Sequence, residues 1–218
     1  MTADKTIAIA YDIARNACPE EFPLFEKNWR IYLTKTVADM NPVLGHCAAL
    51  INDALESMDS KSGSRSKLTV AKRMINGCSR ENFQGVFLDS DGHSCICDGF
   101  RAVRLTDSFA SLPTVPAWQE LPRVFAEPET YTRPLTLPTV TEIKKHVAQQ
   151  KAAEGKNCRP AWDFGEDLPL VSAEYLIDML SIMPGCTAYI AARNAERSPI
   201  YFRAENGDGV LLPVRKNR

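Results

Sequence analysis

Apolar positions in the closing stretch of the chain follow first a helical and then a strand period. Ser172 can cap the first turn of a helix, and Pro184-Gly185 ends it. Between these residues apolar side chains recur at steps of three and four, which predicts one apolar helix face: Leu176, Met179, Leu180 and Met183. Three strands are predicted after this helix, with a tight hairpin turn at Asn206–Gly209 between the last two: 187–191, 200–204 and 210–214.

The same order of elements is predicted earlier in the chain. A short helix is expected at 68–78, with turns at Asp91-Gly92 and Asp98-Gly99 further on. These turns separate three predicted strands: 85–88, 93–97 and 101–105. A helix followed by a three-strand antiparallel meander is therefore expected twice, and the fold class is α+β.

The first part of the chain is predicted to be a helical N-terminal element, 1–60. Its apolar faces either pack within the element or bind a partner. Helices are expected in three places: 6–17, 22–40 and 43–58. The Ser-rich stretch 57–67 is the best boundary in the chain, either a solvated linker or a basic arm. The second domain is expected at 66–218, with an insertion at 106–167 that begins Pro-rich and ends in a helix capped by Thr139.

The composition narrows the class of protein. Of the 218 residues 44% are hydrophobic, which is ample for a packed core. The net charge of -1 argues against wholesale neutralisation of phosphates, although a basic face remains an alternative. Seven irregularly spaced cysteines suit a reducing cytoplasm better than a disulfide scaffold. We find no apolar run of membrane-spanning length and no signal peptide, so we expect a cytoplasmic protein without membrane contact.

Candidate catalytic and metal chemistry is sparse. The three histidines are scattered, and the sequence has no nucleophile elbow, phosphate-binding Gly-rich loop or His-Glu-x-x-His motif. His93, Cys95 and Cys97 would share one face of a strand and could bind zinc. No fourth ligand is evident near them, and cysteine is also a common small buried residue. We therefore expect no catalytic residue, no metal and no cofactor. The protein is expected not to be an enzyme.

Two segments resemble the bacterial sliding DNA clamp, the processivity subunit of the replicative polymerase. Gly85–Leu88, Asp91-Gly92 and Cys97–Arg101 follow the order of a family strand, a turn and a Thr-Asp-Gly-His-Arg-Leu segment. Ser172–Leu176 and Leu212–Arg215 are similar to the family's final Tyr-Leu helix and its Met-Pro-Met-Arg-Leu tail. The two segments cover under half of the chain. The resemblance implies a single DNA-clamp-like domain.

In the clamp family these segments help to build an apolar pocket for short linear peptides of polymerases and repair enzymes. The resemblance implies one wall from Cys97, Gly99, Phe100, Arg101 and Ala102. It implies a second wall from Leu211, Leu212, Pro213, Val214 and Arg215. Family walls come from neighbouring domains, so one possibility is that these two meet across a subunit interface. The other is that both are ordinary strand ends packed in the core.

The resemblance also implies helices that present cations to DNA phosphates without reading the base sequence. The candidates on and beside the first such helix are Lys67, Lys72, Arg73 and Arg80. The second equivalent helix carries Glu174 and Asp178 and no basic residue, which departs from a DNA-lining surface. A closed ring would require a homo-oligomer of several chains.

Two functions are therefore expected. The first is a sliding-clamp-like accessory protein of DNA replication or repair, of bacterial or phage type. It would scaffold a polymerase-type partner, contact double-stranded DNA without sequence specificity, or do both. The second is a protein-interaction module that forms no ring and binds a replication protein through its N-terminal helices.

Overall fold

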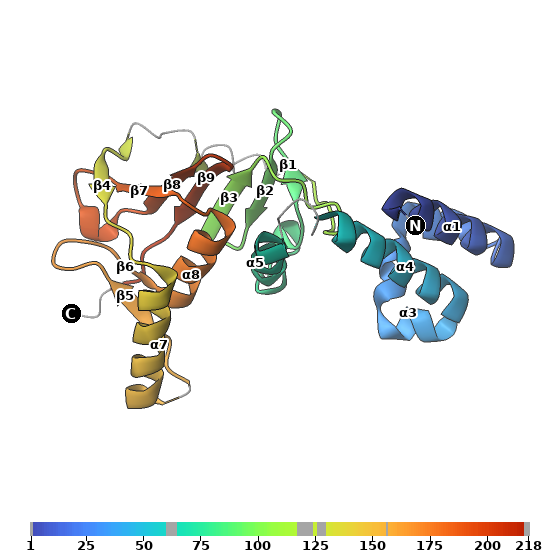
Figure 1. Cartoon of the computed structure of the whole chain (residues 1–218), viewed down its shortest axis with the longest axis horizontal. Coiled ribbons are helices and arrows are strands. Elements are labelled where there is room, and N and C mark those ends of the chain that lie inside the picture. Colours follow the sequence, from blue (N-terminus) through green and yellow to red (C-terminus); the bar gives the residue numbers. More distant parts are fainter. Residues whose placement is uncertain (1, 60–64, 117–123, 126–129, 156, 216–218) are drawn as a thin grey trace. The chain divides into compact units, whose positions relative to one another are not determined.

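The computed structural model describes residues 2–59, 65–116, 124–125, 130–155 and 157–215 (Figure 1). The chain forms two compact units. A helical unit comprises Met1–Arg65 with Phe109–Pro113, and a sheet unit comprises Ser66–Ser108 with Thr114–Arg218. No helix in the described ranges combines the length and the apolarity that crossing a bilayer requires.

The helical unit contains four α-helices and one 3-10 helix within its described residues. They are α1 (Ala3–Ala17), α2 (Phe22–Asn28), the 3-10 helix η1 (Trp29–Leu33), α3 (Lys35–Met40) and α4 (Pro42–Asp59). The single helix expected over 22–40 is wrong, because it is divided into α2, η1 and α3. Asn28 has φ −150° and Thr34 has φ −73° with ψ 136°, so both leave the helical region of backbone space.

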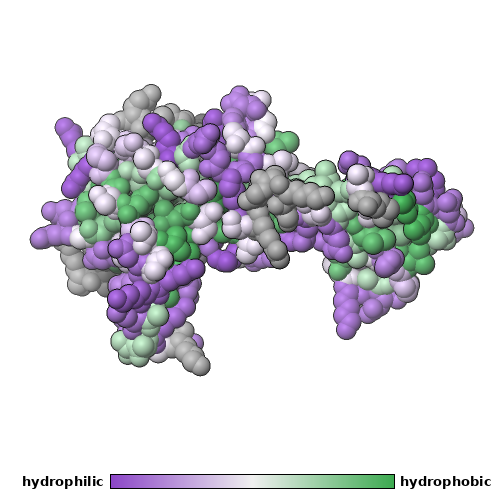
Figure 2. Space-filling view, viewed as in Figure 1, coloured by the Kyte–Doolittle hydropathy of each residue, from purple (hydrophilic) through white to green (hydrophobic). Residues whose placement is uncertain are grey.

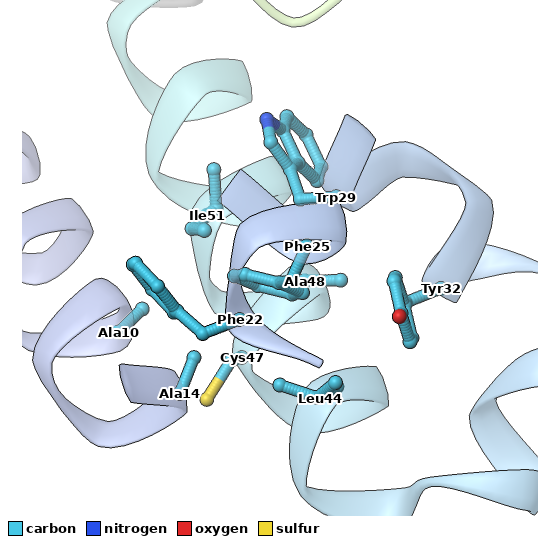
Figure 3. Packing of buried hydrophobic residues seen from close by; sticks show 10 residues of the cluster. All are labelled: Ala10, Ala14, Phe22, Phe25, Trp29, Tyr32, Leu44, Cys47, Ala48 and Ile51. Atoms are coloured by element: carbon cyan, nitrogen blue, oxygen red, sulfur yellow. The ribbon is translucent and has the colours of Figure 1, made fainter. Parts of the chain in front are cut away.

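Aromatic side chains fill the core of the helical unit (Figure 3). Phe25 lies between Tyr11 and Tyr32, with ring centroids 5.8 and 5.4 Å away in edge-to-face geometry. Leu44 and Ile51 of α4 pack into the same cluster and are almost fully buried. Edge-to-face pairs of this kind add to the stabilisation that burial of apolar area provides.

A later segment of the chain completes the helical unit. The buried Asp59 carboxylate accepts hydrogen bonds from the Ala110 and Ser111 amides, both at 3.0 Å, and from Ser111 Oγ. Arg30 Nη2 donates to the carbonyl oxygens of Ala110 and Leu112 at 3.1 Å. The expected insertion 106–167 is therefore shared between the two units.

The sheet unit is α+β and contains a seven-stranded antiparallel sheet in the order β1-β2-β3-β9-β8-β7-β4. Its first elements are α5 (Arg65–Asn76), the 3-10 helix η3 (Glu81–Phe83), β1 (Phe87–Leu88), β2 (Ser94–Cys97) and β3 (Arg101–Leu105). They are followed by β4 (Arg133–Leu135), α7 (Val140–Glu154), β5 (Ala161–Asp163) and β6 (Leu170–Ser172). The last are α8 (Ala173–Ile182), β7 (Thr187–Ile190), the 3-10 helix η5 (Ala195–Arg197), β8 (Ile200–Ala204) and β9 (Gly207–Leu211). The short strands β5 and β6 form a separate pair.

The predicted helix-plus-meander order occurs twice, as α5-β1-β2-β3 and as α8-β7-β8-β9. The two meanders join through their last strands, β3 and β9, so β1-β2-β3 and β9-β8-β7 are arranged symmetrically about this junction, and β4 is added beyond β7. Both predicted helix caps are confirmed. Thr139 and Glu142 form a reciprocal capping box at α7, and Ser172 Oγ accepts from the Tyr175 amide at α8.

The register of the sheet separates two apolar faces. Directly paired residues point to the same side. On the side that we call the helix face, the paired positions are Ile96, Val103, Gly209, Phe202, Ala188 and Leu135. A Cβ at Gly209 would lie 2.6 Å from Met179 Cε and Met183 Sδ, so α8 packs closely on this face. On the opposite side, the outer face, Cys97, Ala102, Val210 and Tyr201 are buried against Phe83 and Phe125.

Both edges of the large sheet carry a feature that opposes further strand pairing. Pro134 is the middle residue of the edge strand β4 and has no amide hydrogen to donate. At the other edge, the Val115 amide donates to the Val86 carbonyl oxygen at 2.9 Å, and a parallel bridge joins Val86 to Thr114. Addition of a strand from another chain is therefore disfavoured at both edges.

Candidate functional site

The two walls expected from the sequence lie side by side in one chain. Arg101 at the start of β3 pairs with Leu211 at the end of β9, and the Leu212 amide donates to the Phe100 carbonyl oxygen at 2.8 Å. No subunit interface is needed to bring them together. We call the turn Asp98–Arg101 and the tail Leu212–Arg215 the open end of the β3–β9 pair.

Exposure divides the residues of these walls into two groups. Cys97, Arg101, Ala102 and Leu211 are buried and belong to the packed sheet. Phe100 is 58% exposed, and Leu212 and Val214 are each 41% exposed. The expectation of core packing thus describes the strand ends, whereas the turn and the tail present apolar side chains to solvent.

A pocket of about 210 Å³ opens at this end. Six predicted wall residues line it: Cys97, Gly99, Phe100, Arg101, Ala102 and Leu212. The sequence did not indicate its other apolar lining, Phe83, Val124 and Val210, because these come from a 3-10 helix, a distant segment and the neighbouring strand. The remaining wall residues, Leu211, Pro213, Val214 and Arg215, do not line it.

The lining of the pocket includes an uncharged thiol and the exposed cation of Arg80. Burial raises the pKa of the Cys97 thiol to about 11, although the hydrogen bond from the Gly99 amide acts in the opposite direction. Cys97 is therefore an uncharged thiol near neutral pH. Arg80 also lines the pocket, and its guanidinium carbon lies 5.8 Å from the centroid of the Phe83 ring.

The turn of the open end is built around Asp98. Its Oδ1 accepts hydrogen bonds from the Phe100 and Arg101 amides, both at 2.9 Å, and Oδ2 accepts from Arg101 Nε at 2.8 Å. Gly99 has φ +90°, a conformation that side-chain-bearing residues rarely adopt. The Asp-Gly turn predicted from the sequence is therefore closed by a side chain as well as by the backbone.

A chain of alternating charges connects this turn to the two helices. Arg101 Nη1 donates to Asp178 Oδ2 at 2.5 Å, and Arg73 Nη1 of α5 donates to Asp178 Oδ1. The Arg101 guanidinium carbon lies 4.3 Å from the centroid of the Tyr175 ring. Side chains of Arg101 and Asp178 are only 2% and 3% exposed, so their charges require each other. Asp178 and Tyr175 were not predicted as site residues; an aspartate within a largely apolar helix was the available signal.

A second and larger pocket, about 410 Å³, lies beside this charge chain. Arg73, Asp98, Arg101, Tyr175 and Asp178 contribute to its lining. The charges of this group cancel, and Glu174 at its margin is paired with Lys151 at 2.7 Å. Phe100 of the smaller pocket packs on Tyr175 of the larger one with 6.0 Å between the ring centroids.

The opposite end of the β3–β9 pair is closed by polar side chains. Asn206 Nδ2 donates to Asp107 Oδ2 at 2.9 Å and to the Ile182 carbonyl oxygen at 3.2 Å. Lys67 Nζ donates to both carboxylate oxygens of Asp107, at 2.7 and 2.9 Å. We call this group, Lys67, Asp107 and Asn206, the sealed end.

The four residues expected to contact DNA occupy different surroundings. Lys67 is held by Asp107 at the sealed end, and Arg73 by Asp178. Arg80 lines the apolar pocket. Lys72 is half-buried and has an interaction of its own. At least two of the four cations are thus already paired with carboxylates.

The zinc interpretation of His93, Cys95 and Cys97 gains no support from the geometry. In the described part of the chain, His93 groups instead with Asp89 and Asp91, whose candidate ligand atoms lie within 4.8 Å of one another. Asp89 Oδ1 accepts from the Asp91 and His93 amides, which is ordinary turn chemistry. Burial raises the pKa of the Cys95 thiol to about 12.

No family model, no curated protein and no solved structure matches this chain.

Proposed function

We propose that this protein is a non-catalytic scaffold that captures a short linear peptide of a partner protein at the open end. The observation that carries the proposal is the meeting of the turn and the tail around one apolar pocket, with Phe100 and Leu212 exposed beside it. The resemblance of two segments to the sliding clamp supports a role for such a scaffold as an accessory protein of DNA replication or repair, with a polymerase-type partner.

The pocket suits one large apolar side chain. A buried cavity of roughly 150 Å³ accommodates benzene, whereas small-molecule sites span roughly 300–1,000 Å³. A volume of about 210 Å³ lies between these limits and fits a leucine or phenylalanine side chain. Arg80 at the margin favours an acidic residue next to it in the peptide, because opposite charges across a rim aid recognition.

Two observations favour a scaffold that does not encircle DNA. Lys67 and Arg73 are paired with carboxylates, so phosphate contacts would have to displace Asp107 and Asp178. Pro134 and the Val115–Val86 hydrogen bond oppose ring growth by strand addition at the sheet edges.

The second candidate function is binding of a replication protein through the helical unit. Ile9 and Ile13, one turn apart on α1, are 38% and 42% exposed. Figure 2 shows hydrophobic surface on the helical unit as well as on the sheet unit, bordered by polar side chains. The full-length Ile9→Lys, Ile13→Lys double variant separates this function from peptide capture at the open end.

The test uses fluorescent, acetylated hexapeptides that carry one Leu or Phe next to either Glu or Lys. Fluorescence anisotropy should show binding of the Glu-containing peptides and weaker binding of their Lys counterparts. Leu212→Ser should lower the affinity roughly tenfold or more, the effect of one interface hot spot. Leu88→Ser is the matched control, since Leu88 is 57% exposed on β1 and lies outside the pocket.

Failure of every hexapeptide to bind the wild-type protein would contradict the proposal. So would equal losses in the Leu212 and Leu88 variants. Pull-downs from replication-competent extracts then compare the α1 double variant with Leu212→Ser. A partner lost with the α1 double variant and retained with Leu212→Ser would favour the helical unit as the binding surface.

A further inference from the structure

We infer that Asp178 and Tyr175 of α8 are positioning residues, which hold the Phe100 wall of the apolar pocket in its binding geometry. The inference rests on the peptide capture proposed above. Neither residue is among the described residues that line that pocket. Both act through Arg101 and Phe100, which do line it.

Closure of the β2–β3 turn does not require α8. Asp98 Oδ1 already accepts the Phe100 and Arg101 amides, and the Asp98 amide donates to the Arg101 carbonyl oxygen at 3.1 Å. These contacts join residues within the turn itself. The bond between Arg101 and Asp178 spans 77 positions of the chain and fixes where the finished turn lies relative to α8.

Burial makes this bond a rigid connection. The Arg101 and Asp178 side chains are almost entirely removed from water, so separation of their charges would leave both without adequate solvation. Asp98 also pairs with Arg101, Arg73 also pairs with Asp178, and the four charges cancel. Arg101 therefore has one favourable placement, and the backbone of β3 that carries it is held with it.

Tyr175 supplies the apolar part of the support. Its ring contacts the Arg101 guanidinium on one side and packs against Phe100. Phe100 needs such a support because it is 58% exposed and follows Gly99, around which a Cβ would meet no atom within 4 Å. A wall that is fixed before binding spares the peptide the cost of ordering it.

The first experiment measures binding of the Glu-Leu hexapeptide to Asp178→Asn and to Tyr175→Leu. Asp178→Asn keeps the size of the side chain, and Tyr175→Leu keeps the charge chain, so one variant remains informative if the other does not fold. Each should bind roughly tenfold more weakly than the wild type. Asn206→Ala is the control, because it removes the hydrogen bonds that anchor the sealed end and leaves the open end intact.

The quantity compared is the affinity of each variant for the hexapeptide, measured where every variant is fully folded. A purely structural role would weaken binding no more in Asp178→Asn than in Asn206→Ala, once all proteins are assayed well below their unfolding temperatures. That outcome overturns the inference. A tenfold loss confined to the two α8 variants supports it.

Hydrogen exchange at the Leu212 amide gives a readout that needs no peptide. This amide donates to the Phe100 carbonyl oxygen, so it reports the position of the wall directly. Exchange should be roughly tenfold faster in Asp178→Asn than in Asn206→Ala after correction for global unfolding. Unchanged exchange overturns the inference, whereas fast exchange in a protein that binds no hexapeptide refutes the proposed function alone.

Discussion

The two ends of the β3–β9 pair are topologically equivalent and chemically different. At each end, the turn that begins one strand lies against the segment that leaves the other. The sealed end is filled by Asn206, Asp107 and Lys67, which satisfy one another. The open end has Phe100 and Leu212 exposed beside a pocket.

The difference shows how a repeated supersecondary unit yields a single candidate site. Backbone pairing provides two corners of the same kind, and side-chain identity decides which can accept a ligand. Polar groups at the sealed end pair internally and leave little to offer a partner. At the open end Arg101 is paired with Asp98 and Asp178, and the apolar side chains of Phe100 and Leu212 remain exposed.

Alanine substitution of one glycine at each end, Gly207 at the sealed end and Gly99 at the open end, should give the largest difference in stability between the two ends. A Cβ at Gly207, φ +139°, would lie 2.0 Å from the Arg104 carbonyl oxygen, whereas one at Gly99 meets nothing within 4 Å. Gly207→Ala should lower the free energy of unfolding by roughly 4 kcal/mol, from backbone strain and overpacking together. Gly99→Ala should cost roughly 1 kcal/mol, from strain alone. Urea denaturation measures both, and equal losses would contradict this view of the two ends.

Removal of one charge at each end should give the next largest difference in the free energy of unfolding between the two ends. Asp178→Asn leaves the buried Arg101 with the Asp98 carboxylate alone, where the wild type has two carboxylates, and should cost roughly 3 kcal/mol. Asp107→Asn weakens a charged hydrogen bond to Lys67, whose side chain is 16% exposed, and should cost roughly 1.5 kcal/mol. Glu174→Gln, in the exposed pair with Lys151, should change stability least of the three. The ranking is measured by urea denaturation at neutral pH, and a reversed order would count against it.

Alkylation of the Cys97 thiol at different pH values tests whether a bound peptide covers the open end. Because the pKa of Cys97 is raised to about 11, little thiolate exists at pH 8 and its share grows about tenfold per pH unit until the pKa is approached. Labelling by iodoacetamide should follow that slope, as it should at Cys186, whose pKa burial also raises to about 11. A bound hexapeptide should protect Cys97 and leave Cys186 unaffected, as read by peptide mass mapping. Protection of both thiols would indicate general stabilisation instead.

The smallest expected effect on stability is at the exposed apolar surface of the open end. Leu212→Ser should change the free energy of unfolding by less than about 0.5 kcal/mol, since it alters a half-exposed side chain whose backbone bond to Phe100 remains. Its peptide affinity should nevertheless fall, which separates binding from folding at this residue. A large shift in the denaturation midpoint would place Leu212 in the core instead.

Local chemistry determined the elements that the sequence predicts well. The caps at Thr139 and Ser172 and the turn at Asp98-Gly99 depend on neighbours within a few residues. The hairpin turn expected at Asn206–Gly209 is wrong: it lies at Glu205-Asn206, because Ala204 already pairs with Gly207, and the last strand is β9 (Gly207–Leu211) instead of 210–214. The helix-plus-meander order was readable twice for the same reason. The break at Thr34 was missed because apolar spacing alone does not report a backbone that leaves the helical region.

The candidate site was readable in part. The sequence placed Phe100 and Leu212 on two walls, but adjacency of the walls depends on the pairing of β3 with β9, more than a hundred residues apart in the chain. Phe83 and Val210 reach the pocket from other elements and carry no local signal.

By itself, then, the sequence determined the order of elements in two α+β repeats, their caps and the Asp98-Gly99 turn, because each follows from contacts between near neighbours. Tertiary structure decided that the open and sealed ends differ, that Arg73 and Arg101 share Asp178, and that Phe109–Pro113 returns to the helical unit. These contacts join residues that are distant in sequence. The pattern of buried positions along the chain does not predict which buried charges pair with one another.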